Sequence, residues 1–456
     1  MAKVFHEVRD PIHVFIKYTS SERKVIDSIP FQRLRHINQL ALSHLVYPGA
    51  THKRFEHSLG VMELATRVFD VITETRAVMP EVLELLPDLN DRERLPYWRR
   101  AVRMAALFHD VGHLPFSHTS EDLLPKGWTH DRMTVEIILG EAMKPLWKEM
   151  KLDPEDIAKL AVGPDEADHC GLDTFTTWEN ILGEIIAGEA FGVDRMDYLL
   201  RDSYHSGVTY GKFDHYRLID TLRILPRPPA GPKDIAPDSS ASATAGRQTR
   251  EPMLGVEKGG LHSAESLLLG RYFMFQQVYL HPIRRIYDIH LKDFLKSSLP
   301  EGQFQTDVDT HLSYTDIEVT CALRAACKDQ EAPGHDHADR ILSRQHFKVL
   351  YEINPYDREK NDDAVAVIAA AASDRYGEEN VRVDPYTKKG GASDFPVLEK
   401  DGRIVSALAE SKTLAGVPSA EAGFVFIKPD LLESAKEWLC KNRDNILETQ
   451  KEEEEE

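Results

Sequence analysis

The stretch Leu107-Phe-His-Asp-Val-Gly-His-Leu-Pro-Phe-Ser-His118 determines how the rest of the chain is interpreted. It follows residues 97–108, whose apolar positions recur at helical spacing, and its glycine and proline predict that this helix ends just after the pair His109-Asp110. Histidines and an aspartate gathered at a helix end have the composition of a metal site. The pair alone is a weak indication, because a helical histidine is more often structural or exposed.

Two further segments supply a fuller set of metal ligands. Arg54-Phe-Glu-His57-Ser-Leu-Gly60 lies upstream on a predicted helix over 55–73, and Gly192-Val-Asp194-Arg-Met-Asp-Tyr198 lies downstream. Two imidazoles and two carboxylates suit a divalent ion such as Mn, Fe, Mg, Ni or Zn, with positions left for water and a substrate oxygen. Such an ion activates water and polarises a phosphoryl oxygen, which favours direct hydrolysis at phosphorus.

These motifs resemble those of a known family. The order H…HD…D is similar to that of the HD-domain phosphohydrolases. The longer runs, together with Trp128-Thr-His130 and Asp-Tyr-Leu-Leu-Arg-Asp202, resemble the deoxynucleoside triphosphate triphosphohydrolases. The resemblance covers residues 8–211 almost continuously and 261–299 more weakly. It implies a mostly α fold, an HD-domain helical bundle with a smaller C-terminal α+β region.

The resemblance also implies a role for each matching residue. The implied metal ligands are His57, His109, Asp110 and Asp194. The implied catalytic groups are His118 as general acid, His130 and Glu121, which orient it, and His113, which contacts the α-phosphate with Arg54. The implied substrate contacts are Arg195 at the outer phosphates, Gln39, Leu40 and Asp202 at the sugar, Tyr198 stacked on it, and Tyr287 excluding ribose. From the residues alone, the alternative for each extra histidine is an ordinary hydrogen-bonded core histidine.

Regulation and partners are implied in the same way. Asp27, Gln32 and Arg35 match residues that read an activating guanine nucleotide in a vertebrate member of the family, although Glu7 and Arg9 depart from its pattern. The alternative is that Asp27 and Arg35 form an ion pair at a helix surface or a subunit interface. The expected partners are a dNTP substrate, an activating nucleotide and further copies of the chain in a dimer or tetramer.

Composition limits the remaining classes of function. The chain has 456 residues and a formal net charge of −19, which argues against a broad platform for nucleic acid. A polyanionic substrate therefore needs local cations, for which Arg54, Arg195 and Arg201 are candidates. No apolar run reaches membrane-spanning length and the N-terminus lacks a signal-peptide core, so a cytoplasmic protein is expected. The four cysteines show no metal-binding or disulfide spacing.

Pattern and composition divide the chain into segments. We expect an HD core over 1–225, a flexible Pro/Ser/Ala-rich insertion over 226–257, core-completing helices over 258–300, an α+β region over 301–450 and an acidic tail over 451–456. Within these segments the patterns predict a strand or extended arm over 4–14, a helix capped by Ser20 or Ser21, helices over 31–40, 128–150 and 364–376, a surface excursion over 81–94, and a hairpin over 397–407.

Two other functions remain open. One keeps the metal site but makes the chain a nucleotide phosphatase or phosphodiesterase, for which the extra histidines and Tyr198 have no obvious use. The other is a non-catalytic sensor of nucleotide or nucleic acid, which would not need both the metal ligands and the acid. The first releases orthophosphate or opens a phosphodiester, whereas the second binds without turnover.

Overall fold

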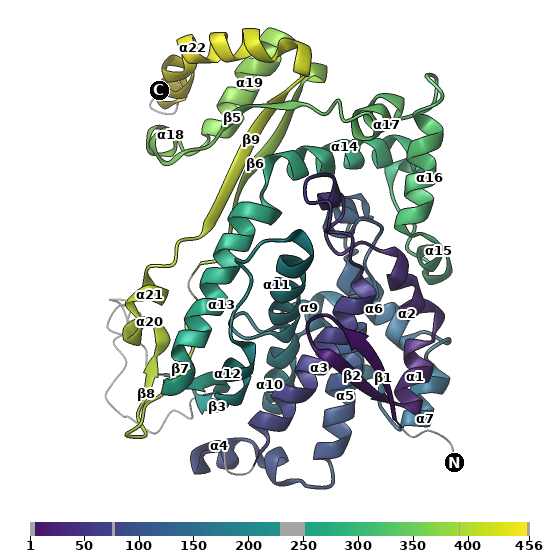
Figure 1. Cartoon of the computed structure of the whole chain (residues 1–456), viewed down its shortest axis with the longest axis vertical. Helices are drawn as coiled ribbons and strands as arrows, with labels where there is room; N and C mark the ends of the chain where they lie inside the picture. The colour runs from purple at the N-terminus through teal and green to yellow at the C-terminus, as the bar shows by residue number, and fades with distance from the viewer. Residues whose placement is uncertain (1–4, 75–77, 229–250, 392, 454–456) are drawn as a thin grey trace.

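The protein is described here from a computed structural model that covers residues 5–74, 78–228, 251–391 and 393–453. The fold is mostly helical, as predicted, with three small sheets (Figure 1). Within these ranges, no helix is both long enough and apolar enough to cross a membrane.

Four helices form the centre of the largest hydrophobic cluster: α3 (Arg54–Ile72), α5 (Leu95–Phe108), α10 (Thr177–Ala187) and α11 (Val193–Ser206). Helix α3 lies within one residue of its predicted bounds, because its apolar positions follow the helical period and are buried. Helix α5 is present as predicted, but it begins a few residues earlier and ends before the pair His109-Asp110 rather than just after it. The same packing brings the N-terminal end of α3, the C-terminal end of α5 and the start of α11 together.

The chain begins with an antiparallel hairpin, β1 (Phe5–Asp10) and β2 (Val14–Thr19), which packs on α3 (Figure 1). Thr19 then caps α1 (Ser20–Ile26). Its hydroxyl accepts from the Glu22 N–H at 3.2 Å, and the Glu22 carboxylate accepts from the Thr19 N–H at 2.7 Å. This reciprocal capping box makes the prediction of Ser20 or Ser21 as the cap wrong by one or two residues.

Three other predicted elements differ from the structure. The segment 31–40 is helical only as far as His36, as α2 (Ile29–Arg33) and a 3₁₀ turn. The segment 128–150 divides at Gly140 into α6 (His130–Leu139) and α7 (Lys144–Met150). The predicted surface excursion is wrong in part, because α4 (Pro80–Leu85) and the following 3₁₀ turn bury Val82 and Leu89 in the main core.

The later part of the chain begins with α13 (Leu261–Met274), a π-helical turn (Phe275–Tyr279) and α14 (Pro282–Ser298). Helix α17 (His335–Leu342) packs against α14, and α16 (Asp316–Ala326) packs against α17 (Figure 1). Beyond them is the predicted α+β region, a sheet in the order β5-β9-β6 with two long helices and the short α18 (Pro355–Lys360). Its elements are β5 (Lys348–Glu352), α19 (Ala364–Tyr376), β6 (Val381–Lys389), β9 (Ala420–Ile427) and α22 (Leu432–Glu453).

The predicted hairpin is present as β7 (Pro396–Leu398) and β8 (Ile404–Ser406). It does not join the C-terminal sheet but extends a second one, in the order β3-β4-β7-β8, with β3 (Leu222–Pro226) and β4 (Pro252–Glu257). Strand β3 ends at Pro226, where the predicted insertion begins, and β4 forms the last six residues of that segment, so its end is a strand and not part of a flexible insertion. Its greater part, 229–250, lies outside the described residues, as does the end of the predicted acidic tail.

Candidate metal centre

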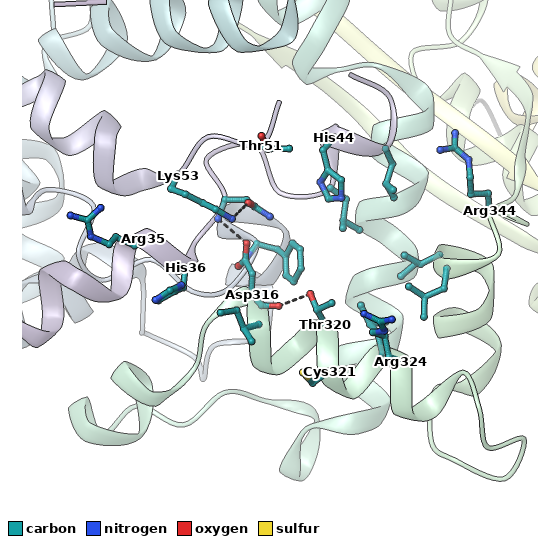
Figure 2. A pocket seen from close by; sticks show the side chains of 18 residues that line it. Arg35, His36, His44, Thr51, Lys53, Asp316, Thr320, Cys321, Arg324 and Arg344 are labelled. Atoms are coloured by element: carbon teal, nitrogen blue, oxygen red, sulfur yellow. Dashed lines mark hydrogen bonds between the residues drawn. The ribbon is translucent and has the colours of Figure 1, made fainter. Parts of the chain in front are cut away.

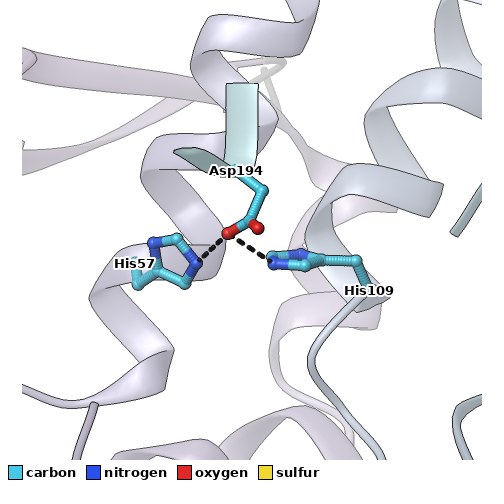
Figure 3. Close-up of side chains that lie close together, drawn as sticks. All are labelled: His57, His109 and Asp194. Carbon is cyan, nitrogen blue, oxygen red and sulfur yellow. Dashed lines mark hydrogen bonds and ion pairs between the residues drawn. The ribbon is translucent and has the colours of Figure 1, made fainter. Parts of the chain in front are cut away.

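Three segments that are distant in sequence meet where α3, α5 and α11 converge. His57 lies in the first turn of α3, His109 caps the end of α5 and Asp194 lies in the first turn of α11. Their ligand atoms all lie within 4.8 Å of one another. Asp194 Oδ1 is 3.0 Å from His57 Nε2 and 3.5 Å from His109 Nε2, so one carboxylate oxygen faces both rings (Figure 3).

Asp110 completes the set of four predicted ligands. Its Oδ2 is 3.6 Å from His57 Nε2 and its Oδ1 is 3.4 Å from His109 Nε2. The Arg54 guanidinium donates to Asp110 Oδ2, and its Nε donates to the Ser117 hydroxyl at 2.8 Å. Arg54, predicted to contact the α-phosphate, is therefore buried beside a candidate metal ligand.

The rings present the nitrogens that a metal needs. The Nδ1–H of His109 donates to the Ala106 carbonyl at 2.8 Å, which leaves the lone pair on Nε2, and this buried Nε2 has no hydrogen-bond partner among the described residues. The Nδ1–H of His57 donates to Asp197 Oδ2 at 2.8 Å, so its Nε2 also faces the cluster. Because an outer acceptor fixes each tautomer, these residues fit a divalent ion well.

The charges around the centre favour a cation. Burial opposes ionisation of Asp110 and Asp194, but neighbouring cations, Arg54 above all for Asp110 and the two histidines for Asp194, hold the pKa of both carboxyls below its usual value. Burial disfavours protonation of His57, yet its hydrogen bonds to Asp194 and Asp197 raise its pKa to about 10. The carboxylates of Asp110 and Asp194 therefore favour a proton on His57. A divalent ion bound between these residues would replace that proton.

A second group of predicted residues lies next to Asp110. The rings of His113 and His130 stack with centroids 4.0 Å apart, and Glu121 Oε1 lies 3.3 Å from His113 Nδ1 and 3.0 Å from His130 Nδ1. Burial, Arg54 and His130 lower the pKa of His113 to about 3, whereas Glu121 overcomes burial and raises the pKa of His130 to about 9. The side chain of His118, the predicted general acid, lies outside the described residues.

The predicted sugar-binding residues do not all lie together. Asp202 accepts from the Tyr279 hydroxyl at 2.7 Å and contacts His52 Nε2 at 2.7 Å, and the Tyr198 ring lies 6.0 Å from that of Tyr279. Tyr287 is instead fully buried in another hydrophobic cluster, with its ring 4.8 Å from His346. The tyrosine beside Asp202 is therefore Tyr279, which the prediction missed.

Gln39 and Leu40 lie close to the same place. The backbone N–H of Gln39 donates to the carbonyl of His52 at 3.0 Å, and His52 in turn contacts Asp202. The Gln39 side-chain oxygen is buried without a hydrogen-bond partner among the described residues, and Leu40 is buried.

Two arginines flank Tyr198. Arg195 follows the ligand Asp194 directly, and Arg271 of α13 also acts electrostatically on both Arg195 and Tyr198. Buried nitrogens of each guanidinium, Nε of Arg195 and Nε and Nη1 of Arg271, lack a partner among the described residues. Donors held in this way suit a bound anion. Arg271 was not predicted, because nothing in its local sequence marks it.

Arg201 differs from these two arginines. Its guanidinium donates to Asp197 at 2.8 and 2.9 Å and to Asp10 at 2.9 Å, and the side chain is fully buried. The interpretation of Arg201 as a helper for a polyanionic substrate is therefore not supported by its contacts. It is a structural group.

Within one chain, the three predicted regulatory residues make separate contacts. Asp27 pairs with Arg23 at 3.3 Å, whereas Gln32 accepts from Arg35 at 2.8 Å. The alternative ion pair between Asp27 and Arg35 is not among the described interactions either. Of the three, Arg35 alone lines a cavity of about 670 Å³ (Figure 2). The basic residues around this cavity are Arg35, His36, His44, Lys53, Arg324 and Arg344.

Comparison with known proteins gives consistent matches. Residues 54–201 match the HD domain model and residues 247–382 match the HD associated region model. An uncharacterized protein of Methanocaldococcus jannaschii is 33% identical over 364 residues, which span 77% of this chain and 62% of that protein. The uncharacterized protein YwfO of Bacillus subtilis is 30% identical over 375 residues, spanning 77% of this chain and 72% of that protein.

Two further matches add an activity and a structure. The human deoxynucleoside triphosphate triphosphohydrolase SAMHD1 is 34% identical over 239 residues, 48% of this chain but only 36% of that enzyme. The crystal structure of a hypothetical protein from Aquifex aeolicus superimposes with a TM-score of 0.74 at 31% identity, over 95% of this chain and 100% of that one. This chain thus spans less than two thirds of the archaeal and human proteins.

Proposed function

The chain belongs to the HD-domain family of metal-dependent phosphohydrolases, and we propose that it hydrolyses deoxynucleoside triphosphates to deoxynucleoside and inorganic triphosphate. The matched HD segment contains all four candidate metal ligands. The human relative that carries this activity in its name matches about half of the chain. These matches support the reaction class, and the arrangement of the site supports the substrate.

The observation that carries the proposal is the pair of arginines beside Tyr198. Arg195 directly follows the candidate ligand Asp194, and buried nitrogens of Arg195 and Arg271 have no hydrogen-bond partner among the described residues, whereas Arg54 is bound to Asp110. A monophosphate needs no such additional cations. A triphosphate whose α-phosphorus lies at the metal extends its outer phosphates away from it, and two more guanidinium groups can neutralise them.

A divalent ion held by His57, His109, Asp110 and Asp194 would supply an activated water and polarise the α-phosphoryl oxygen. Asp202 and Tyr279 offer hydrogen bonds to the sugar 3′-hydroxyl, with Tyr198 against the sugar. His113 stays neutral at pH 7, so it can donate a hydrogen bond to the α-phosphate without adding charge. His118, the general acid that the resemblance implies, would protonate the departing 5′-oxygen, and His130 and Glu121 would orient it.

Activation by a nucleotide is the second part of the proposal. The basic cavity concentrates positive charge on a chain with a net charge of −19, which favours a polyanionic ligand. Its wall also reaches the catalytic segments, because Lys53 precedes Arg54 and Phe116 precedes Ser117. We expect the active species to be a homo-oligomer.

Incubation with Mn²⁺ and each dNTP, singly and mixed, followed by anion-exchange chromatography, tests the reaction. Triphosphate with free deoxynucleoside is the expected product, and turnover only in the mixture would identify a nucleotide activator. Release of orthophosphate would favour the phosphatase alternative. Thermal stabilisation by dNTP without any product would favour a sensor.

A further inference from the structure

A buried carboxylate stands behind the ring of His57. Asp197, one turn after the ligand Asp194 on α11, receives the Nδ1–H of His57 on Oδ2 at 2.8 Å. Its other oxygen lies 2.6 Å from Nε2 of His13 in the N-terminal hairpin. The side chains of His13, His57 and Asp197 are all fully buried, so no water competes for these contacts.

Arg201 ties the same carboxylate to a second hairpin residue. Its Nε and Nη2 donate to the two oxygens of Asp197 at 2.8 and 2.9 Å, and its Nη1 donates to Asp10 Oδ2 at 2.9 Å. Asp10 Oδ1 in turn accepts the backbone N–H groups of Ile12 and His13, each at 2.8 Å. Asp197 therefore accepts four hydrogen bonds, which is about the capacity of a carboxylate, and its orientation is fixed.

Two backbone features are needed for this arrangement, the absence of a side chain at Gly60 and an unusual backbone conformation at Val14. A Cβ atom at Gly60, on the α3 face next to His57, would lie 2.0 Å from Asp197 Oδ1. Val14, which follows His13, has a φ of 66°, a conformation that β-branched residues rarely adopt. Such strain persists only where surrounding contacts hold it. The hairpin turn is thus held in the form that directs His13 inward.

We propose that Asp10 and His13 of the hairpin are positioning residues of the metal centre, acting on His57 through Asp197. Two carboxylates against one guanidinium leave a net negative charge behind His57. That charge fixes the tautomer of the ring and makes its Nε2 a stronger ligand. The inference rests on the proposed function only in that the centre binds a divalent ion, and not on the substrate.

The test measures Mn²⁺ affinity of the metal-free full-length protein by equilibrium dialysis, independently of hydrolysis. His13→Ala and Asp10→Asn should raise the Kd for Mn²⁺ roughly 10-fold or more, as for other groups that orient a metal-bound histidine. His13→Gln keeps an N–H donor for Asp197 and should recover part of the affinity.

Two control variants separate positioning from loss of stability. Ile16→Val removes a fully buried methylene from the same hairpin and should lower stability by about 1 kcal/mol without changing the Kd. Lys17→Gln on the exposed face should change neither. An unchanged Kd in His13→Ala, or an equal rise in Ile16→Val, overturns the inference.

The outcomes also separate this inference from the proposed function. Tight Mn²⁺ binding that depends on His13, in a protein that releases no triphosphate, retains the inference and rejects the substrate. Triphosphate release with an unchanged Kd in His13→Ala does the reverse. A wild-type protein that binds no metal overturns both.

Discussion

The metal centre can be compared with a second cluster of the same residue types. His290 and Asp293 lie one turn apart on α14, and His337 of α17 faces them, with ligand atoms within 4.8 Å of one another. His290 is fully buried, like His57. By composition and distance alone, either cluster could hold a metal.

The surroundings of the two clusters are opposite. Behind His57 stands Asp197, whereas Nε2 of His290 accepts the backbone N–H of Phe347 at 3.3 Å and so commits its lone pair. Asp293 is bound by Arg382 at 2.8 Å. Burial, His337, Arg340 and Arg382 lower the pKa of His290 to about 2, whereas carboxylates raise that of His57 to about 10. We infer that, of these two clusters, the first binds a cation, because an acceptor fixes Nδ1 of each of its histidines and leaves Nε2 for the ion.

The largest expected effect comes from breaking the first cluster. His109→Ala removes one of its two candidate imidazole ligands. Loss of a group that only orients a metal ligand lowers activity by roughly 10- to 100-fold, so loss of a ligand itself should lower kcat/KM by more than about 100-fold. Metal content, measured by atomic absorption on the same sample, should fall with it. A variant that keeps a full equivalent of metal and activity within tenfold of wild type would contradict the assignment.

The opposite pKa values predict opposite pH dependences in the metal-free protein. His57, with its raised pKa, contributes stability below about pH 6.5 that is lost as the pH rises towards 10. His290, with its lowered pKa, contributes stability above about pH 6.5 that is lost as the pH falls. Each slope is at most about 1.4 kcal/mol per pH unit.

Urea unfolding at several pH values measures these slopes. His290→Asn should flatten the loss of stability between pH 6.5 and 5, and His57→Asn should flatten the loss between pH 7 and 9. If neither variant changes its slope, the charge contrast between the clusters is wrong.

A smaller effect is expected on substrate binding, and it should differ between Tyr279, which contacts Asp202, and Tyr287, which lies beside His346. Tyr279→Phe removes a hydrogen bond to Asp202 and should raise the KM for dNTP by about tenfold or less, since such a bond contributes roughly 0.5–1.5 kcal/mol. Tyr287→Phe should leave KM unchanged, because its buried hydroxyl has no partner among the described residues. The reverse result would restore Tyr287 as the sugar-facing residue.

The smallest expected effect comes from the second cluster. His337→Ala should leave the metal content unchanged and alter the free energy of unfolding by no more than about 1 kcal/mol, since the side chain is partly exposed and only loosely paired. Loss of one metal equivalent per chain in this variant would show that the two clusters are alike.

Local sequence predicted much of the fold. Helix α19 has its predicted bounds, and α3 and α5 are close to theirs, because apolar residues at helical spacing become a buried face wherever the helix packs. Capping and segment ends were less well predicted. Thr19 and Gly140 act through short-range backbone contacts, for which the sequence offers several equivalent candidates.

For the candidate site too, local motifs could be recognised in the sequence, whereas residues whose roles depend on distant contacts could not. The four candidate ligands could be proposed from the sequence because their motifs are local. Asp197 was missed although it follows Asp194 by three residues, since its role depends on His13, which is 184 positions away. Tyr279 was missed because a π-helical turn ends at that residue, and the extra residue per turn changes which side chain faces the site.

Gly60 helps to distinguish relatives of this protein that bind the metal well from those that do not. A glycine inside a helix costs about 1 kcal/mol relative to alanine, so helix propensity alone would favour alanine at this position of α3. Alanine at this position would drive Asp197 away from His57 while leaving every ligand in place. A relative that has all four candidate ligands but a side chain at this position would therefore match the motif of the enzyme. We expect it to bind the metal weakly all the same.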